Sequence, residues 1–129
     1  MDVVFTNSII TPPALTLPSR EIGASVEFWG IVREMEAAQA LAGLHYEAYE
    51  SMARREFARI ADALAAQHPL TAALVIHRLG WVPVGEASLF VRVLARNRGP
   101  ALSYCGALID RMKADVPIWK VSNLAQHGS

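Results

Sequence analysis

Two lysines near the end of the chain are the residues whose placement points most directly to chemistry. Lys113 and Lys120 lie on either side of Pro117. Proline ends a helix, because it lacks an N–H group and holds the residue before it in extended backbone. Lys113 is therefore expected in the last turn of a helix, and Lys120 on an extended segment that leaves it. Two amines held near one another would form a site for an anionic substrate.

The helix that carries Lys113 has a candidate inward face. Leu102, Cys105, Gly106, Ile109 and Lys113 recur at intervals of three or four residues, which is the spacing of one helical stripe. On this interpretation the alkyl stem of Lys113 packs inward and its ammonium group emerges where the helix stops. The alternative is a hydrated lysine that only complements the helix dipole. Spacing leaves both open.

Further polar residues could complete an anion site. Arg33 follows a strand-like run, and Arg96, Asn97 and Arg98 lie between a strand and a helix that opens at Gly99-Pro100. Backbone N–H groups at a helix N-terminus, together with a guanidinium, readily bind phosphate. The alternative for each of these residues is an ordinary solvated surface position.

Composition limits the class of protein. A chain of 129 residues is the size of one domain, so a single domain over residues 1–129 is expected. Its 12 basic and 12 acidic residues balance, which argues against a general nucleic-acid or membrane-surface binder. Hydrophobic residues make up 53% of the chain, which indicates that another subunit covers some apolar surface.

The cysteine, the histidines and the hydropathy profile exclude several kinds of site. Cys105 is the single cysteine, which fits a reducing compartment, and its place on an apolar stripe favours a packing role. The histidines lack metal-ligand spacing, and His77 lies in an apolar strand-like run that favours a structural role. We expect neither a metal nor a cofactor. No apolar run reaches membrane-span length and the N-terminus resembles no signal peptide, so a cytoplasmic protein is expected.

The predicted elements alternate irregularly between strands and helices. Strands are expected at 3–6, 24–33, 44–49, 73–79, 87–95 and 118–122, and helices at 52–67 and 99–114. A turn region is expected around Gly80, Pro83 and Gly85, and a mobile loop at 34–42. This order favours an α+β fold with a mainly antiparallel sheet and two main helices packed on it.

Five segments carry a family resemblance, in order and in spacing, across residues 20–120. They are 23–33 (GASVEFWGIVR), 44–49 with the following Met52-Ala53, 75–80, 84–86, and the tail from Lys113 to Lys120 with Pro117-Ile118-Trp119 between. Together they resemble the large catalytic subunit of molybdopterin synthase. The resemblance implies an α/β-hammerhead-type fold and one domain of this type over residues 1–129.

The resemblance also implies a function. It implies a sulfurtransferase that moves sulfur from a small ubiquitin-like subunit, ending in a Gly-Gly thiocarboxylate, to cyclic pyranopterin monophosphate. Lys113 and Lys120 would be catalytic, and Arg33, Asn97, Arg98 and Lys120 would bind substrate. The family forms a homodimer within a heterotetramer, and its substrate pocket draws residues from both large subunits.

Two alternatives remain beside this hypothesis. Asn97 stands where the family usually has histidine, and nine residues follow Lys120 where relatives usually have a longer tail. Both departures favour a divergent, non-catalytic module that binds a ubiquitin-like partner. A single-stranded nucleic-acid binder using Arg92, Arg96 and Arg98 with Trp81 or Tyr104 is disfavoured by the zero net charge.

Overall fold

The structure of the protein is a computed structural model that describes residues 1–36, 39–40 and 42–121. In these residues the chain forms a four-stranded sheet, a three-stranded sheet, a two-stranded hairpin and two long helices. In chain order the elements are β1 (Asp2–Thr6), β2 (Ala24–Ile31), β3 (Met35–Glu36), β4 (Gln39–Ala40), β5 (Gly43–Ala48), α1 (Glu50–Ala65), β6 (Ala72–Arg78), β7 (Gly80–Pro83), β8 (Ala87–Ala95), α2 (Arg98–Asp115) and β9 (Ile118–Lys120).

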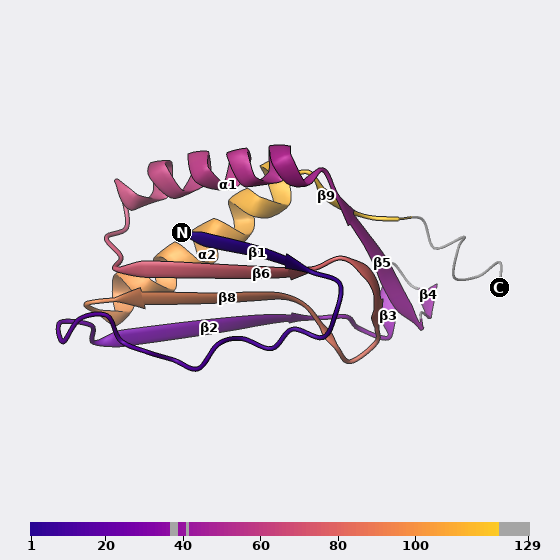
Figure 1. The fold of residues 1–129 in the computed structure, drawn as a ribbon, viewed down its shortest axis with the longest axis horizontal. Coiled ribbons are helices and arrows are strands. Elements are labelled where there is room, and N and C mark those ends of the chain that lie inside the picture. Colours follow the sequence, from indigo (N-terminus) through magenta and orange to yellow (C-terminus); the bar gives the residue numbers. More distant parts are fainter. Residues whose placement is uncertain (37–38, 41, 122–129) are drawn as a thin grey trace.

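The four-stranded sheet has the order β1-β6-β8-β2. β1 runs parallel to β6, whereas β6 with β8 and β8 with β2 are antiparallel. β1 and β2 are therefore its two edges. Figure 1 shows these strands side by side, with α1 running along the β1 edge and α2 crossing behind the sheet. The predicted α+β fold, with a mainly antiparallel sheet and two helices packed on it, is confirmed.

The face of the sheet under the helices carries the main core. Because side chains alternate across a strand, Val91 and Val93 of β8 point to the same face, and both are fully buried. Phe57 of α1 and Tyr104 and Leu108 of α2 fill the layer above them. Fully burying a side chain of this kind stabilises the fold by about 1.5–3 kcal/mol, so this layer fixes both helices on the sheet.

The opposite face is partly covered by the segment that follows β1. Ile10 is buried there against Ile76 and Phe90. The Arg92 guanidinium donates a hydrogen bond to the Pro13 carbonyl at 2.9 Å. These contacts hold the proline-containing segment on the sheet.

The three-stranded sheet, β7-β5-β9, lies at the end of the molecule where β2 stops (Figure 1). A second apolar cluster, formed by Val32, Leu44 and Val82, joins the two sheets. β5 pairs antiparallel with both β7 and β9. The chain after α2 is therefore built into the same end of the molecule as the chain after β2.

Two segments differ from the sequence prediction. The expected turn region contains a strand, β7. Gly80, its first residue, and Gly85, which follows it, take left-handed conformations (φ 82° and 88°) and bend the chain twice. In the expected loop at 34–42, β3 pairs with β4, and residues 37, 38 and 41 lie outside the described residues. Neither helix in the described residues has the length and apolar character needed to cross a bilayer.

Candidate functional site

Lys113 and Lys120 lie at one end of the molecule, joined by a short link. Lys113 is in the last turn of α2, and Lys120 is the last residue of β9. The link has a fixed backbone, because the Tyr49 N–H donates to the Pro117 carbonyl at 3.1 Å and β9 pairs with β5. The helix therefore ends before Pro117 and the chain continues as a strand, as the sequence predicts. Both lysines are exposed.

The predicted inward stripe of α2 is wrong at three of its five positions, whereas Cys105 is buried and Ile109 packs against the core. Leu102 is 57% exposed, and Gly106 and Lys113 are exposed as well. The residues that α2 buries are Ala101, Tyr104, Cys105, Leu108 and Met112. Small and apolar residues occur almost all round this helix, so the three-to-four spacing fits two adjacent faces and does not choose between them. Lys113 consequently lies on an exposed face of the helix.

Arg33 lies at the end of β2, close to the second sheet. The residue before it, Val32, is held on both sides: its N–H donates to the Glu86 carbonyl at 3.0 Å, and its carbonyl accepts from the Gly85 N–H at 2.9 Å. Val32 is also buried in the cluster that joins the two sheets. The backbone of Arg33 is thereby fixed while its side chain is exposed. We call Arg33, Lys113 and Lys120 the lysine end.

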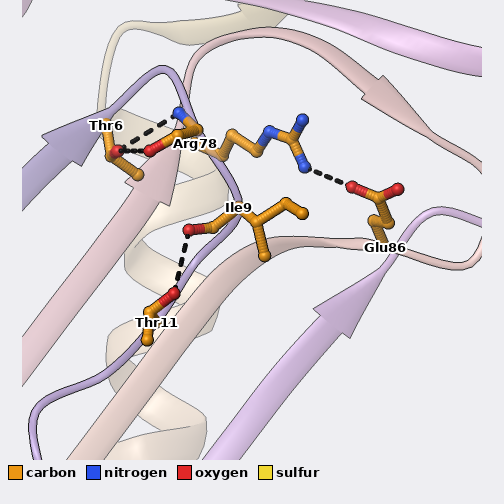
Figure 2. Close-up of polar contacts among 6 residues, drawn as sticks. Thr6, Ile9, Thr11, Arg78 and Glu86 are labelled. Carbon is orange, nitrogen blue, oxygen red and sulfur yellow. Dashed lines mark hydrogen bonds and ion pairs between the residues drawn. The ribbon is translucent and has the colours of Figure 1, made fainter.

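An ion pair braces the turn beside Arg33. The Arg78 side chain at the end of β6 reaches the Glu86 carboxylate at 2.6 Å, and Figure 2 shows it extended toward that residue. Since the Glu86 backbone carbonyl accepts from Val32, the pair holds the turn that positions Arg33. Arg78 is 8% exposed. The sequence does not reveal this brace, because no helical or strand periodicity relates two residues on either side of a short strand.

His77 has the structural role predicted for it. It is buried, and its Nδ1 lies 2.8 Å from the Arg78 carbonyl. A carbonyl only accepts, so Nδ1 carries the proton. The Tyr46 ring meets the imidazole edge-on at 5.2 Å between centroids. Burial lowers the pKa of His77, and the hydrogen bond to the carbonyl offsets this in part.

The remaining candidate residues lie at the other end of α2. Asn97 is its N-cap residue, with extended backbone and no side-chain capping bond, and Arg98 is its first residue. Arg96, Asn97 and Arg98, which we call the arginine turn, are exposed and line a hollow of about 510 Å³ together with Gly23. No acidic residue lies in the first turn of α2, so its free N–H groups favour an anion.

The candidate residues thus form two groups and not one. Arg98 and Lys113 lie fifteen residues apart on the same helix. At a rise of about 1.5 Å per residue this places them about 22 Å apart along the helix axis. Arg33 lies at the lysine end, since β2 runs from the arginine turn toward the second sheet (Figure 1). One protomer therefore cannot close all five predicted residues around one small substrate.

Other chemistry finds less support in the described residues. No group of three or more His, Cys, Asp or Glu side chains there could hold a metal ion, and His127 lies outside them. Burial raises the pKa of the Cys105 thiol, which disfavours a thiolate nucleophile. Of the residues considered for nucleic-acid binding, Tyr104 is buried and Arg92 is ion-paired with Glu27 at 2.7 Å.

Fold and site together define a class: an α+β protein with two exposed cationic groups, one at each end of its second helix, both suited to anions. Comparison with known families is more specific. The model of the family described as MoaE protein matches residues 6–115. The chain belongs to the MoaE protein family, as its sequence motifs predict.

Individual relatives are consistent with membership of this family. A molybdopterin synthase catalytic subunit from Oryza sativa subsp. indica is 46% identical over 98 residues, which are 76% of this chain and 51% of the relative. One from Pyrococcus abyssi is 37% identical over 102 residues, 79% of this chain and 69% of the relative. This chain thus spans about half the length of the rice relative.

A solved structure is also similar. Molybdopterin synthase from Staphylococcus aureus matches with a TM-score of 0.82 at 30% identity, over 91% of this chain and 87% of that chain. A molybdopterin biosynthesis MoaE protein from Burkholderia ambifaria has the same fold, with a TM-score of 0.82 at 24% identity over 95% of this chain and 82% of that chain.

Proposed function

We propose that this chain is the catalytic subunit of a molybdopterin synthase, a sulfurtransferase of molybdenum cofactor biosynthesis. The proposed donor is a small ubiquitin-like carrier that ends in a Gly-Gly thiocarboxylate. The proposed acceptor is cyclic pyranopterin monophosphate, which receives two sulfur atoms. The observation that carries the proposal is the lysine end, where Lys113, Lys120 and Arg33 are exposed together beside a fixed backbone.

The relatives support this activity and a partner of this kind. Proteins 46% and 37% identical to this chain bear the name molybdopterin synthase catalytic subunit. A solved complex of subunits 1 and 2 of molybdopterin-converting factor from Helicobacter pylori has a chain of this fold, with a TM-score of 0.71. A carrier tail of two glycines needs only a narrow groove, and both lysines are exposed to such an approach.

The proposed chemistry assigns the residues different roles. In each transfer the acyl–sulfur bond of the carrier breaks, and water supplies the oxygen of the carboxylate left on the carrier. Sulfur becomes bonded to a substrate carbon whose carbon–oxygen bond breaks, and the displaced oxygen leaves as water or remains on the phosphate. Lys113 would act on the reacting acyl group as base, acid or nucleophile. Lys120 and Arg33 would hold the substrate phosphate by charge-assisted hydrogen bonds.

The arginine turn would act from a second copy of the chain. Arg98 and Lys113 are about 22 Å apart along one helix, which exceeds what one small substrate can bridge. A site that uses Asn97, Arg98, Lys113 and Lys120 must therefore combine the lysine end of one protomer with the arginine turn of another. We propose this composite site within a homodimer that binds one carrier per protomer.

Turnover by single variants tests the assignment. With a thiocarboxylated carrier and cyclic pyranopterin monophosphate, Lys113→Ala should nearly abolish product formation. Lys120→Ala should keep measurable turnover with a raised KM. A Lys113→Ala rate above about a tenth of wild type, equivalent to a barrier change below about 1.4 kcal/mol, would remove Lys113 from the chemistry.

The binding-module hypothesis rests on Asn97, which replaces the family's usual histidine with a side chain that cannot be charged. It makes a different prediction in the same assay. A module would bind the carrier, measured by calorimetry, yet wild type would form no product. Carrier binding without turnover would therefore refute the synthase hypothesis and support the binding-module hypothesis.

A further inference from the structure

We propose that Tyr46 is a further substrate-binding residue of the lysine end, and that its ring is the apolar wall against which the fused rings of the acceptor lie. This inference rests on the proposed function, because it names the surface that cyclic pyranopterin monophosphate contacts beside its phosphate. The residues proposed above to bind this substrate are all charged or polar. They can hold a phosphate, but binding sites for flat ring systems also present apolar or aromatic side chains.

Tyr46 lies directly beside Lys120. β5 is the middle strand of the three-stranded sheet, and its residue Tyr46 pairs with Lys120 of β9. Opposed residues of an antiparallel pair project from the same face of a sheet, with their Cβ atoms about 4.5–5.5 Å apart. The Tyr46 ring and the Lys120 side chain therefore leave the sheet next to one another.

The face that these two residues share is turned toward the body of the molecule. Tyr46 packs against the apolar cluster that joins the two sheets, and one member of that cluster, Val32, directly precedes Arg33. Ile118, two residues before Lys120 on β9, packs against the main core. Tyr46 consequently borders both Lys120 and the cluster from which Arg33 emerges, and these are the two cations proposed to hold the phosphate.

The Tyr46 ring is held on one side and accessible on another. The buried His77 imidazole lies 5.2 Å from it between centroids, at an interplanar angle of 66°. His77 is fixed in turn by its hydrogen bond to the Arg78 carbonyl. On β7 the partner of Tyr46 is Gly80, which has no side chain, and a Cβ atom built there would meet nothing within 4 Å. Tyr46 is thus a preset, partly exposed ring, and such rings bind ligands at little cost in conformational entropy.

The chemistry of the two proposed ligands favours the acceptor as the group that contacts Tyr46. The carrier tail ends in two glycines, which have no side chains, so an aromatic wall adds little to their binding. Fused rings are flat and bury area against an aromatic side chain. When Lys120 holds the phosphate, the ring of its strand neighbour Tyr46 is within reach of the atoms next to that phosphate.

Two ligands separate the ring contact from the charge contact. Binding is measured by calorimetry on the full chain without the carrier, so that no sulfur is transferred. Tyr46→Leu should raise the Kd of cyclic pyranopterin monophosphate about tenfold, equivalent to about 1.4 kcal/mol, and leave the Kd of inorganic pyrophosphate unchanged. Tyr46→Phe is the conservative variant, and because it keeps the ring it should retain affinity for the acceptor.

Tyr49→Leu is the matched control. Tyr49 is 57% exposed and lies just beyond the end of β5, at the start of α1. The same loss of a ring at this position should leave the Kd of both ligands unchanged. Circular dichroism checks that each variant is folded.

The wild type gives an independent readout that needs no folded Tyr46→Leu variant. The chain has three tyrosines. With their rings isotope-labelled, nuclear Overhauser transfer from the bound acceptor to one tyrosine ring is expected, and Tyr46→Phe should abolish it.

Three results would overturn the contact. The first is a folded Tyr46→Leu variant with unchanged acceptor affinity, or with an equal loss of pyrophosphate affinity. The second is a Tyr46→Phe variant that binds the acceptor as weakly as Tyr46→Leu, which would assign the effect to the hydroxyl group. The third is the absence of Overhauser transfer in the wild type.

These outcomes are separable from those of the proposed function. Acceptor binding that depends on the Tyr46 ring, in a protein without turnover, would leave the contact intact and refute the synthase activity. Turnover by Tyr46→Leu with an unchanged KM for the acceptor would leave the activity intact and remove Tyr46 from the site.

Discussion

At the scale of single residues, His77 should make folding sensitive to mild acid. Burial lowers its pKa below the usual histidine value of 6.5 in the folded protein, so the unfolded chain binds a proton more readily. Above pH 6.5 both states are neutral at this residue and its contribution is constant. As the pH falls from 6.5 through the lower folded-state pKa, the free energy of unfolding should therefore decrease. Urea unfolding between pH 7.5 and pH 5, in steps of about half a unit, measures the slope.

The matched variants isolate this contribution. His77→Gln should lower stability at neutral pH, because the hydrogen bond to the Arg78 carbonyl and the contact with Tyr46 change, but it should flatten the decline below pH 6.5. His68→Gln, outside this cluster, is the matched control. A slope unaffected by His77→Gln would assign the acid sensitivity to other groups.

Asn97 carries a second prediction at this scale. The side-chain amide of Asn97 would hydrogen-bond an anionic group that a histidine contacts in relatives. If so, Asn97→His should keep the fold and leave activity equal or higher. A charge-assisted contact exceeds a neutral one by about 1 kcal/mol, so the gain should be about fivefold. It should be larger at pH 6 than at pH 8, because imidazole charges as the pH falls.

Arg98→Ala is the comparison for Asn97→His. It should weaken substrate binding at every pH in this range, because a guanidinium does not titrate there. A gain at position 97 that is independent of pH would argue against a charged contact.

The types of the site residues were readable from the sequence, but their surroundings were not. Pro117 acts locally, so the placement of Lys113 on a helix and Lys120 on a strand followed from the sequence. Whether Lys113 packs inward depends on which face of α2 meets the sheet, and that is decided by tertiary contacts. The Arg78–Glu86 brace likewise exists only because the fold sets the end of β6 beside the turn before β8.

At the scale of elements, the arginine turn depends on how closely β2 begins against it. A Cβ atom added at Gly23 would meet the Arg96 carbonyl oxygen far inside van der Waals contact. Gly23→Ala should therefore displace the turn and weaken anion binding there, measured as a lower affinity for pyrophosphate by calorimetry. The free energy of unfolding should fall by about 1–3 kcal/mol.

Gly106→Ala provides the opposite case. Gly106 lies within α2, and a Cβ atom there meets nothing within 4 Å in the protomer. Alanine is a better helix former, so this variant should raise stability by about 0.5–1 kcal/mol and leave pyrophosphate affinity unchanged. Equal effects of the two substitutions would contradict the close approach of β2 to the arginine turn.

The elements themselves were largely predictable. Alternating apolar residues and glycine or proline boundaries located β2, β5, β6 and β8 to within two residues at each end. The strand β7 was missed because it is only four residues long, begins at one glycine and ends two residues before another, and each glycine serves a separate bend. Turn composition indicated that the chain bends there, but the number of bends depends on pairing with β5.

At the scale of the whole molecule, the separation of the arginine turn from the lysine end favours a dimer. α2 is rigid and holds Arg98 and Lys113 at its two ends. A substrate that needs both can be served only if a second protomer supplies the missing group. The residues of the arginine turn and of the lysine end could be predicted from the sequence. The distance between the two groups could be known only from the structure.

Mixing two inactive variants tests this composite site directly. Arg98→Ala and Lys113→Ala should each show strongly reduced turnover as pure dimers. After subunit exchange, a mixed dimer has one site with Lys113 from the first chain and Arg98 from the second, while its other site lacks both. Random exchange makes half of the dimers mixed, so turnover should recover to about a quarter of wild type. Lys113→Ala mixed with Lys120→Ala is the control. Both residues belong to the lysine end of one protomer, so every site lacks one of them and turnover should not exceed the mean of the two pure variants. No recovery in the test pair, despite subunit exchange confirmed by mass spectrometry, would show that each protomer holds its own complete site. Recovery in the control would show instead that Lys113 and Lys120 of one site come from different protomers.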